Sequence, residues 1–220
     1  MDNKILKELQ DKDIFLFDFD GTLVETEELH MKAHLEILKK ILGREVDITS
    51  EEFLRRYKGK QDDEIFEMYK KDFCVDFDKQ KMIAEKIDIA LDILRKANLN
   101  VFDYFFELVK LKKDKSFYIL SNQTHKILFE MLKDKDIYKY FDNIFCLPDL
   151  KVSKEYFLDN ISNFLNVNNK KIVLFEDTNF ALKKAKELDI LPIGVETIVN
   201  VGSLKDAKFV IRPLTDEKSN

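Results

Sequence analysis

The sequence has little glycine, proline or cysteine and no tryptophan, with 5 Gly, 3 Pro and 2 Cys among 220 residues. Because glycine and proline mark turns and irregular backbone, their scarcity excludes collagen-like, low-complexity and glycine-rich all-β proteins. The two cysteines, Cys74 and Cys146, are too few for a disulfide framework and have no histidine or cysteine neighbour at metal-binding spacing. We expect both to be inert thiols in the core.

Long apolar runs and blocks of one charge are also missing. The longest apolar runs, such as residues 14–17, are far shorter than the ~18 residues that a membrane span needs. The first residues lack a signal-peptide pattern. The net charge is −5, with acidic and basic residues interspersed along the chain. We therefore expect a cytoplasmic protein with no membrane or nucleic-acid partner. The oligomeric state stays open, with a monomer plausible.

Hydrophobic residues make up 45% of the chain and include 19 Phe, which is enough for a sizeable core. Short β-branched and aromatic runs, typical of buried parallel strands, alternate with segments whose apolar residues recur every three or four positions, as in helices. The predicted strands are 14–17, 117–120, 143–147, 172–175, 191–195 and 208–211, and the predicted helices between them are 104–114, 125–135, 154–165 and 179–188. This alternation predicts an α/β fold with a doubly wound parallel sheet.

The segment between the first two predicted strands breaks the alternation, because nearly all of it has a helical pattern. One helix is expected at 27–42, ended by Gly43, and a short one after Thr49, which forms a capping box with Glu52. Further helices are expected at 62–72 and 79–98. We interpret 27–98 as an all-helical cap inserted into a core made of 1–26 and 99–220.

Polar residues follow four of the predicted strands. In an open parallel sheet, ligands bind beyond the carboxyl ends of the strands, so these residues are candidates for a site. They are Asp18 and Asp20 after the first strand, Ser121 and Asn122 after the second, Asp149 and Lys151 after the third, and Glu176, Asp177 and Thr178 after the fourth. We expect them to share one rim of the sheet.

The carboxylates of Asp18, Asp20 and Asp177 are expected to converge, because a turn at Gly21 can re-aim Asp20. Close carboxylates repel each other by on the order of several kcal/mol in a low dielectric, and a hard divalent cation would relieve that repulsion. Ligands that are all oxygen fit Mg²⁺ better than Zn²⁺. Lys151 and the Ser121 hydroxyl would then supply the positive charge and the hydrogen-bond donor that a phosphoryl group needs.

These residues resemble the motifs of the haloacid dehalogenase-like (HAD) hydrolases over nearly the whole chain. The run from Asp18 to Val24 resembles the first motif of that family, Ser121 the second, Lys151 the third, and Glu176 with Asp177 the fourth. The resemblance implies a Rossmann-like core. The inserted helices are similar to the C1-type cap of the subfamily that contains β-phosphoglucomutase and phosphoglycolate phosphatase.

The resemblance implies that Asp18 attacks phosphorus to form an aspartyl phosphate and that Asp20 exchanges a proton with the leaving group and water. The role of Asp20 needs a pKa raised towards neutrality. Mg²⁺ would be held by Asp18, Asp20 through its backbone carbonyl, and Asp177, with Glu176 acting through metal-bound water. Ser121 and Lys151 would hold the phosphoryl group. The residues assigned to substrate binding are Thr22, Asn122, Thr26 and His30.

Two lysines compete for the third motif, because the usual Lys-Pro-x-Pro of the family is here Lys-Val-Ser-Lys, from Lys151 to Lys154. We favour Lys151, since Lys154 falls at the start of a helix with Ser153 as its cap.

The resemblance favours a Mg²⁺-dependent phosphohydrolase of small phosphorylated metabolites, with sugar phosphates as the expected class. Asp20 favours phosphoryl transfer over dehalogenation, because the dehalogenases of the family carry an aromatic residue there. The alternative is a phosphomutase of the β-phosphoglucomutase kind. Where that enzyme carries an arginine for a second phosphate, this chain has Asp62, whose charge would repel one. A catalytically idle binding protein is a third interpretation, which the intact set of site residues disfavours.

Overall fold

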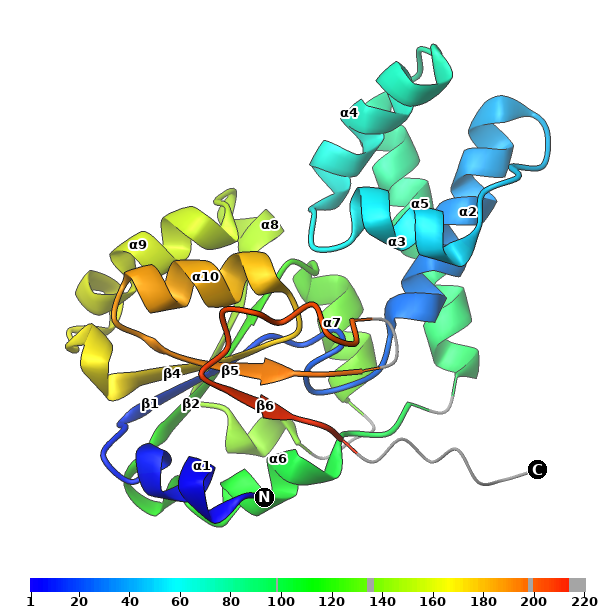
Figure 1. Ribbon diagram of the computed structural model, residues 1–220. Coiled ribbons are helices and arrows are strands. Elements are labelled where there is room, and N and C mark those ends of the chain that lie inside the picture. Colours follow the sequence, from blue (N-terminus) through cyan, green and yellow to red (C-terminus); the bar gives the residue numbers. More distant parts are fainter. Residues whose placement is uncertain (98, 134–136, 198–199, 214–220) are drawn as a thin grey trace.

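Six parallel strands form one sheet in the order β3-β2-β1-β4-β5-β6 (Figure 1). The computed structural model describes residues 1–97, 99–133, 137–197 and 200–213. The strands are β1 (Ile14–Phe17), β2 (Ser116–Ser121), β3 (Asn143–Cys146), β4 (Ile172–Glu176), β5 (Leu191–Val195) and β6 (Phe209–Ile211). Central β1 pairs with both β2 and β4, so residues that follow these three strands lie at one edge of the sheet.

Helices cover both faces of the sheet, which confirms the doubly wound α/β fold (Figure 1). Side chains alternate between the faces along a strand, so Phe15 and Phe17 pack on one side and Ile14 and Leu16 on the other. The first face is covered by α1 (Asn3–Leu9), α6 (Asp103–Val109) and α7 (His125–Leu132), and the second by α8 (Leu147–Leu150), α9 (Lys154–Leu165) and α10 (Asn179–Glu187).

Phenylalanine rings stack across the centre of the sheet. Phe17 on β1 is in register with Phe175 on β4, and their ring centroids are 4.7 Å apart. Phe15 is likewise in register with Phe117 on β2, at 5.0 Å. Stacked aromatic pairs add stabilisation beyond their buried area. The strands that end at the candidate site are therefore held by closely packed aromatic side chains.

The segment from Glu27 to Lys96, between β1 and β2, forms a separate group of helices beyond the edge of the sheet (Figure 1). It has its own hydrophobic core, in which Ile37, Phe66 and Tyr69 are fully buried. An inserted all-helical cap is thus confirmed, whereas the domain boundaries at 26/27 and 98/99 stay a prediction. The cap helices are α2 (Glu27–Leu42), α3 (Ser50–Tyr57), α4 (Asp62–Phe73) and α5 (Lys79–Lys96).

Local signals account for several helix ends in the cap. Gly43 ends α2 with a φ of 66°, in the left-handed region that favours glycine. The Thr49 side chain accepts a hydrogen bond from the Glu52 backbone N–H at 3.2 Å, which is one half of the predicted capping box. The other half is absent from the described contacts, because the Glu52 carboxylate accepts a hydrogen bond from Arg56 instead.

The structure corrects three details of the sequence prediction. The helix expected at 104–114 ends at Val109, and a short 3₁₀ turn at Lys112–Asp114 leads into β2. Leu147, expected to end a strand, begins α8, because Pro148 cannot donate to a strand ladder. Cys74 is exposed at the end of α4 rather than in the core, whereas Cys146 is buried as expected.

Two further segments differ in extent from the prediction. Helix α1 was not predicted; Asp2 caps it through the Lys4 backbone N–H, and Ile5 and Leu9 pack against the core. The helix expected at 125–135 ends at Leu132, and residues 134 and 135 of that prediction lie outside the described residues.

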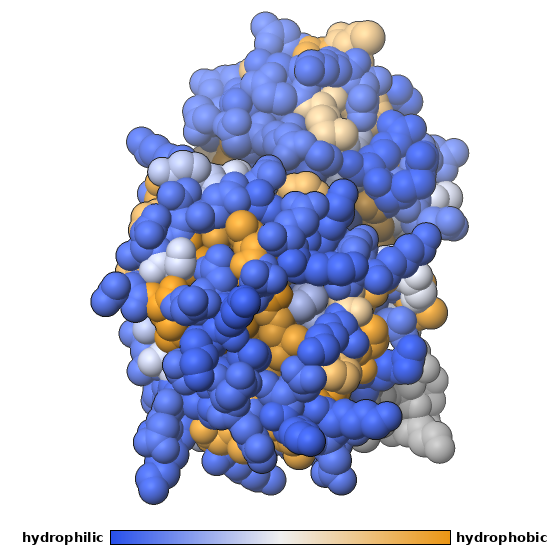
Figure 2. All heavy atoms as spheres, turned by 60° about the vertical axis from the view of Figure 1, so that its left-hand side comes forward, coloured by the Kyte–Doolittle hydropathy of each residue, from blue (hydrophilic) through white to orange (hydrophobic). Residues whose placement is uncertain are grey.

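Hydrophilic side chains cover most of the face seen in Figure 2, and hydrophobic side chains are visible there in scattered patches between them. Within the described part of the chain, no helix combines the length and the apolar character that crossing a bilayer requires.

Candidate active site

The loop after β1 carries Asp18 and turns sharply at Gly21. The Asp18 N–H donates to the Phe175 carbonyl at 2.9 Å, which extends the pairing of β1 and β4 up to the site. Gly21 has a φ of 68°, and a Cβ atom there would lie 2.4 Å from Asp177 Oδ2. Both the left-handed backbone and the close approach of Asp177 therefore require glycine at this position.

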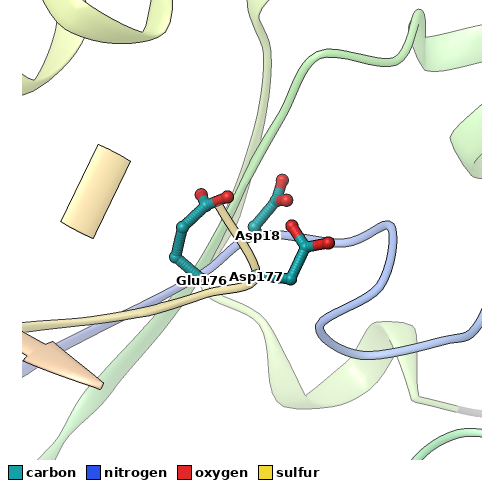
Figure 3. Close-up of side chains that lie close together, drawn as sticks. All are labelled: Asp18, Glu176 and Asp177. Atoms are coloured by element: carbon teal, nitrogen blue, oxygen red, sulfur yellow. The ribbon is translucent and has the colours of Figure 1, made fainter. Parts of the chain in front are cut away.

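Three buried carboxylates gather where β1 and β4 end: Asp18, Glu176 and Asp177 (Figure 3). One ligand oxygen from each lies within 4.8 Å of the others. Burial raises the pKa of Asp18 to about 8, and the nearby charge of Glu176 adds to this rise. Burial also raises the pKa of Asp177 well above its usual range, against the lowering effect of Lys58. The surroundings of the cluster thus disfavour ionisation of all three carboxylates together, even with Lys58 and Lys154 paired to them.

The cluster differs in membership from the sequence prediction, which placed Asp20 in it and Glu176 behind it. The Asp20 carboxylate instead accepts a hydrogen bond from Thr26 Oγ1 at 2.5 Å and lies 3.0 Å from His30 Nε2. The Asp20 side chain contacts the start of α2 and is not one of the three carboxylates that gather within 4.8 Å, although its charge still helps to raise the pKa of Asp18. The donor set that remains is still all oxygen, and it fits Mg²⁺ better than Zn²⁺.

The surroundings of Asp20 do not produce the raised pKa that its proposed role was expected to need. Burial acts to raise the pKa of Asp20, but the charge of His30 and the hydrogen bonds from His30 and Thr26 outweigh it. The pKa of Asp20 therefore lies below its ordinary value, and this carboxyl is ionised while it keeps these partners.

Lys154, rather than Lys151, lies beside the carboxylates, which corrects the sequence prediction. Lys154 Nζ is 2.9 Å from Asp18 Oδ1 and 2.9 Å from Glu176 Oε2. Burial acts to lower the pKa of Lys154, but the charges of Asp18 and Glu176 raise it above its usual value. Lys151 is exposed at the end of α8 in a left-handed conformation, with a φ of 56°.

The position of Lys154 at the start of a helix was the reason for preferring Lys151, but this position is what brings Lys154 to the site. The Ser153 side chain caps α9 as predicted, through the Tyr156 N–H at 3.1 Å. Side chains in the first turn of a helix lean back towards its N-terminus. Because α9 begins beside the ends of the strands, the long Lys154 side chain reaches Asp18 and Glu176.

The hydroxyl and amide side chains of the prediction lie around the same rim. Ser121 is fully buried at the end of β2, and its Oγ accepts a hydrogen bond from the Gln123 N–H at 3.0 Å. Thr22 is fully buried, and its Oγ1 has no hydrogen-bond partner among the described residues. Asn122 Nδ2 donates to the Gly59 carbonyl of the cap at 3.2 Å.

Two cap residues that were not among the predicted site residues also reach the core. Lys58 Nζ forms ion pairs with Asp177 Oδ2 at 2.6 Å and with Glu27 Oε1 at 3.2 Å. Gln61 Nε2 donates to the Val152 carbonyl at 3.0 Å. A side chain that bridges two separately folded parts has no local sequence signature, so motif spacing alone could not identify Gln61.

The cap and the core enclose one cavity of about 890 Å³. Its core side includes Asp18, Asp20 and Lys154, and its cap side includes His30 and Lys58. The cavity has room for a small metabolite as well as a phosphoryl group, with carboxylates, Lys151, Lys154 and the polar rim of the sheet at its core end.

Comparisons with known proteins agree with this architecture. Residues 15–195 match the model of the family described as haloacid dehalogenase-like hydrolase. A Thermotoga maritima protein named phosphorylated carbohydrates phosphatase is 30% identical over 205 residues, which cover 89% of this chain and 88% of the relative.

Solved structures show the same fold at lower sequence identity. A β-phosphoglucomutase from Clostridium difficile superposes with a TM-score of 0.77 at 21% identity, covering 92% of this chain and 91% of that one. CbbY from Rhodobacter sphaeroides, solved in complex with phosphate, superposes with a TM-score of 0.76 at 18% identity, covering 91% of this chain and 93% of that one. The family match spans most of the chain, from the second residue of β1 to the end of β5, and includes the whole cap. The chain therefore belongs to the haloacid dehalogenase-like hydrolases.

Proposed function

We propose that this protein is a Mg²⁺-dependent phosphohydrolase of small phosphorylated metabolites, with sugar phosphates as its substrate class. The observation that carries the proposal is the buried contact between Asp18 and Lys154 within an acidic cluster at the end of β1. This arrangement pairs a carboxylate nucleophile with a cation for the phosphoryl oxygens. The activity named for the Thermotoga maritima relative supports a phosphorylated carbohydrate as substrate.

Asp18 and Asp177 are the proposed Mg²⁺ ligands, with Glu176 beside them and Asp20 contributing its backbone carbonyl. The pKa values of Asp18 and Asp177 support this assignment, because burial and repulsion between the carboxylates raise both. Lys58 and Lys154 are paired with these carboxylates, and the pKa values stay raised in spite of them. When bound, Mg²⁺ would supply positive charge that lets an anionic carboxylate approach an anionic phosphoryl group.

Asp18 is the proposed nucleophile. Its carboxylate oxygen forms a bond to phosphorus while the bond from phosphorus to the ester oxygen breaks, which leaves an aspartyl phosphate and the alcohol. Water then attacks phosphorus, releases inorganic phosphate and restores Asp18. Lys154 and the Ser121 hydroxyl would hold the phosphoryl oxygens through both displacements, with Thr22 and Asn122 beside them at the rim.

Asp20 is the proposed proton donor and acceptor. Ionised in its contacts with Thr26 and His30, it is already suited to take a proton from the attacking water. To protonate the leaving group first, it must be neutral, and a phosphoryl dianion bound nearby would raise its pKa by like-charge repulsion. Thr26 and His30 would keep its carboxyl directed into the cavity.

Release of inorganic phosphate from a panel of sugar phosphates with Mg²⁺ tests the proposal, with Asp18→Asn as the comparison. We expect release by the wild type and a loss of roughly 10⁴-fold or more in the variant, because the nucleophile is removed. Formation of glucose 6-phosphate from β-glucose 1-phosphate without net release would instead indicate a phosphomutase. No turnover of any ester would leave a binding protein.

A further inference from the structure

A lysine is fully buried in the cap and serves no part of the proposed chemistry. Lys86 on α5 is 1% exposed, and its Nζ donates to both carboxylate oxygens of Asp62, at 3.0 and 3.1 Å. A buried ammonium is tolerated only when a counter-charge and hydrogen bonds replace its water. Asp62, the first residue of α4, provides that charge.

A histidine and a tyrosine complete a hydrogen-bonded group around Asp62. His34 Nε2 is 3.2 Å from Asp62 Oδ1, and His34 Nδ1 is 3.0 Å from the Tyr69 hydroxyl. Burial lowers the pKa of His34 to about 4, and the charge of Lys86 adds to this effect. The imidazole is therefore neutral at pH 7, with Nε2 donating to Asp62 and Nδ1 accepting from Tyr69. We call Lys86, Asp62, His34 and Tyr69 the cap cluster; its net charge is zero.

The cap cluster lies at the wall of the cavity that also contains Asp18. Lys86, Asp62 and His34 all line this cavity, and the Asp62 side chain is 23% exposed. The adjacent Gln61 is hydrogen bonded to the core at Val152, which holds the start of α4 at the junction of cap and core. Because the phosphoryl group is assigned to the core end of the cavity, the cap cluster is available to the rest of the substrate.

No cap lysine along this cavity is left unpaired among the described residues. Lys86 is paired with Asp62, Lys58 with Asp177 and Glu27, and Lys60 with Glu64. A second anionic group on a substrate would have to displace a carboxylate from its lysine, whereas a hydroxyl group can donate to an Asp62 oxygen without disturbing Lys86.

We propose that the cap cluster selects phosphate esters whose other end carries uncharged hydroxyl groups and rejects those with a second anionic group. Asp62 accepts the substrate hydroxyl, and Lys86 and His34 hold the Asp62 carboxylate in position for it. This inference rests on the proposed function, since it describes the part of the substrate that remains beyond the transferred phosphoryl group.

The test compares two ligands that differ only at the remote end: sorbitol 6-phosphate, which ends in an alcohol, and 6-phosphogluconate, which ends in a carboxylate. Dissociation constants are measured by calorimetry with Mg²⁺ in an Asp18→Asn background, so that binding is read without turnover. We expect sorbitol 6-phosphate to bind at least roughly tenfold more tightly, about 1.4 kcal/mol. Asp62→Asn, which leaves Lys86 charged and unpaired, should shift the ratio of the two constants by roughly tenfold or more towards 6-phosphogluconate.

Two further variants keep the result interpretable. Asp76→Asn removes the same charge from an exposed cap residue that pairs with Lys70, and it should leave the ratio unchanged. Asp62→Asn combined with Lys86→Met removes both charges, which protects against misfolding caused by an unpaired buried lysine. This double variant should bind the two ligands with a ratio near one.

Equal binding of the two ligands by the protein with an intact cap cluster would overturn the inference, as would failure of both to bind. A double variant that keeps the original preference would overturn it as well, because the preference would then arise elsewhere. Hydrolysis of p-nitrophenyl phosphate by the wild type tests the proposed function separately, since this ester lacks hydroxyl groups at its other end. Failure of the inference can therefore be distinguished from failure of the proposed function.

Discussion

Lys151 and Lys154 carry the same charge and lie three residues apart, but the direction of the backbone determines which of them contacts Asp18. Lys151 has a left-handed backbone at the end of α8 and is exposed. Lys154 stands in the first turn of α9 and contacts Asp18. An ammonium that compensates a buried carboxylate must itself lie out of water, which is the reason for proposing Lys154 as the functional lysine.

Replacement of each lysine by methionine tests this assignment. We expect Lys154→Met to lower the rate of phosphate release by roughly 10²–10³-fold, because it removes the cation nearest Asp18. Lys151→Met should stay within about twofold of the wild type, because its exposed side chain lines the cavity but, among the described contacts, forms no ion pair with Asp18 or Glu176. The measurement is kcat for one sugar phosphate. A larger loss in Lys151→Met than in Lys154→Met would contradict the assignment.

The neutral His34 should make stability depend on pH. Its pKa is about 4 in the folded protein against 6.5 for the ordinary side chain, so between these values the unfolded chain binds a proton that the folded chain does not. The free energy of unfolding should therefore fall as pH drops from 6.5 to 4, by roughly 3 kcal/mol from this residue. Urea unfolding of wild type and His34→Gln across this range should show the difference between them changing by that amount.

The exposed His125 supplies the control for this experiment. His125→Gln makes the same substitution at an exposed position, and it should leave the pH dependence of stability unchanged. A stability difference between wild type and His34→Gln that stays constant from pH 4 to 6.5 would show that His34 does not remain neutral in the fold.

At the level of elements, the turn between β1 and α2 joins the sheet to the cap and sets the positions of two carboxylates. Gly21 lets the chain reverse directly above Asp177, and Asp18 and Asp20 leave this turn in different directions. The strand before the turn is held by the stacked rings of Phe17 and Phe175. A rigid strand and a tight glycine turn together determine the geometry of the acidic cluster.

Two glycines with nearly the same backbone conformation allow the effect of backbone strain on stability to be separated from the effect of a steric clash on activity. Gly21 and Gly43 have φ values of 68° and 66°, but an added Cβ at Gly43 has no atom within 4 Å. Alanine at either position should lower stability by about 1–2 kcal/mol because of the left-handed backbone. Only Gly21→Ala should also abolish phosphate release, since its methyl group would displace the Asp177 carboxylate. Urea unfolding and phosphate release measure the two effects; equal activity of the two variants would refute this.

At the level of the whole molecule, negative charge is concentrated where the core meets the cap. Asp177 is fully enclosed between its neighbours Asp18 and Glu176 and the cap lysine Lys58. Burying carboxylates this close together opposes folding, and a bound cation would offset part of that repulsion. Stability of the entire chain should therefore depend on Mg²⁺.

Thermal unfolding with Mg²⁺ and with a chelator measures this dependence. Mg²⁺ at about 100 times its dissociation constant should raise the free energy of unfolding by about 2.7 kcal/mol. Asp177→Asn should lose most of this increase, because it removes a proposed ligand, whereas Asp76→Asn at an exposed cap position should keep it. An equal increase in Asp177→Asn and wild type would place the cation elsewhere.

Much of the architecture followed from the sequence, because strands and helices are set by local pattern. The period of hydrophobic residues identified six strands and the helical insertion, and the rule that parallel strands end at one edge brought Asp18, Ser121 and Asp177 together as candidates. Errors fell where tertiary contacts override local pattern: the end of α6, the start of α8 at Leu147, and the exposed Cys74.

By itself, the sequence determined which residues stand at the ends of the strands, since chain order and hydrophobic period suffice for that. Only the tertiary structure decided where their side chains point. It placed Glu176 rather than Asp20 in the acidic cluster, and Lys154 rather than Lys151 in contact with Asp18. It also paired Lys86 with Asp62 in the cap. Side-chain direction depends on backbone dihedral angles and on charged residues from segments distant in the sequence. The local spacing of residues predicts neither of these.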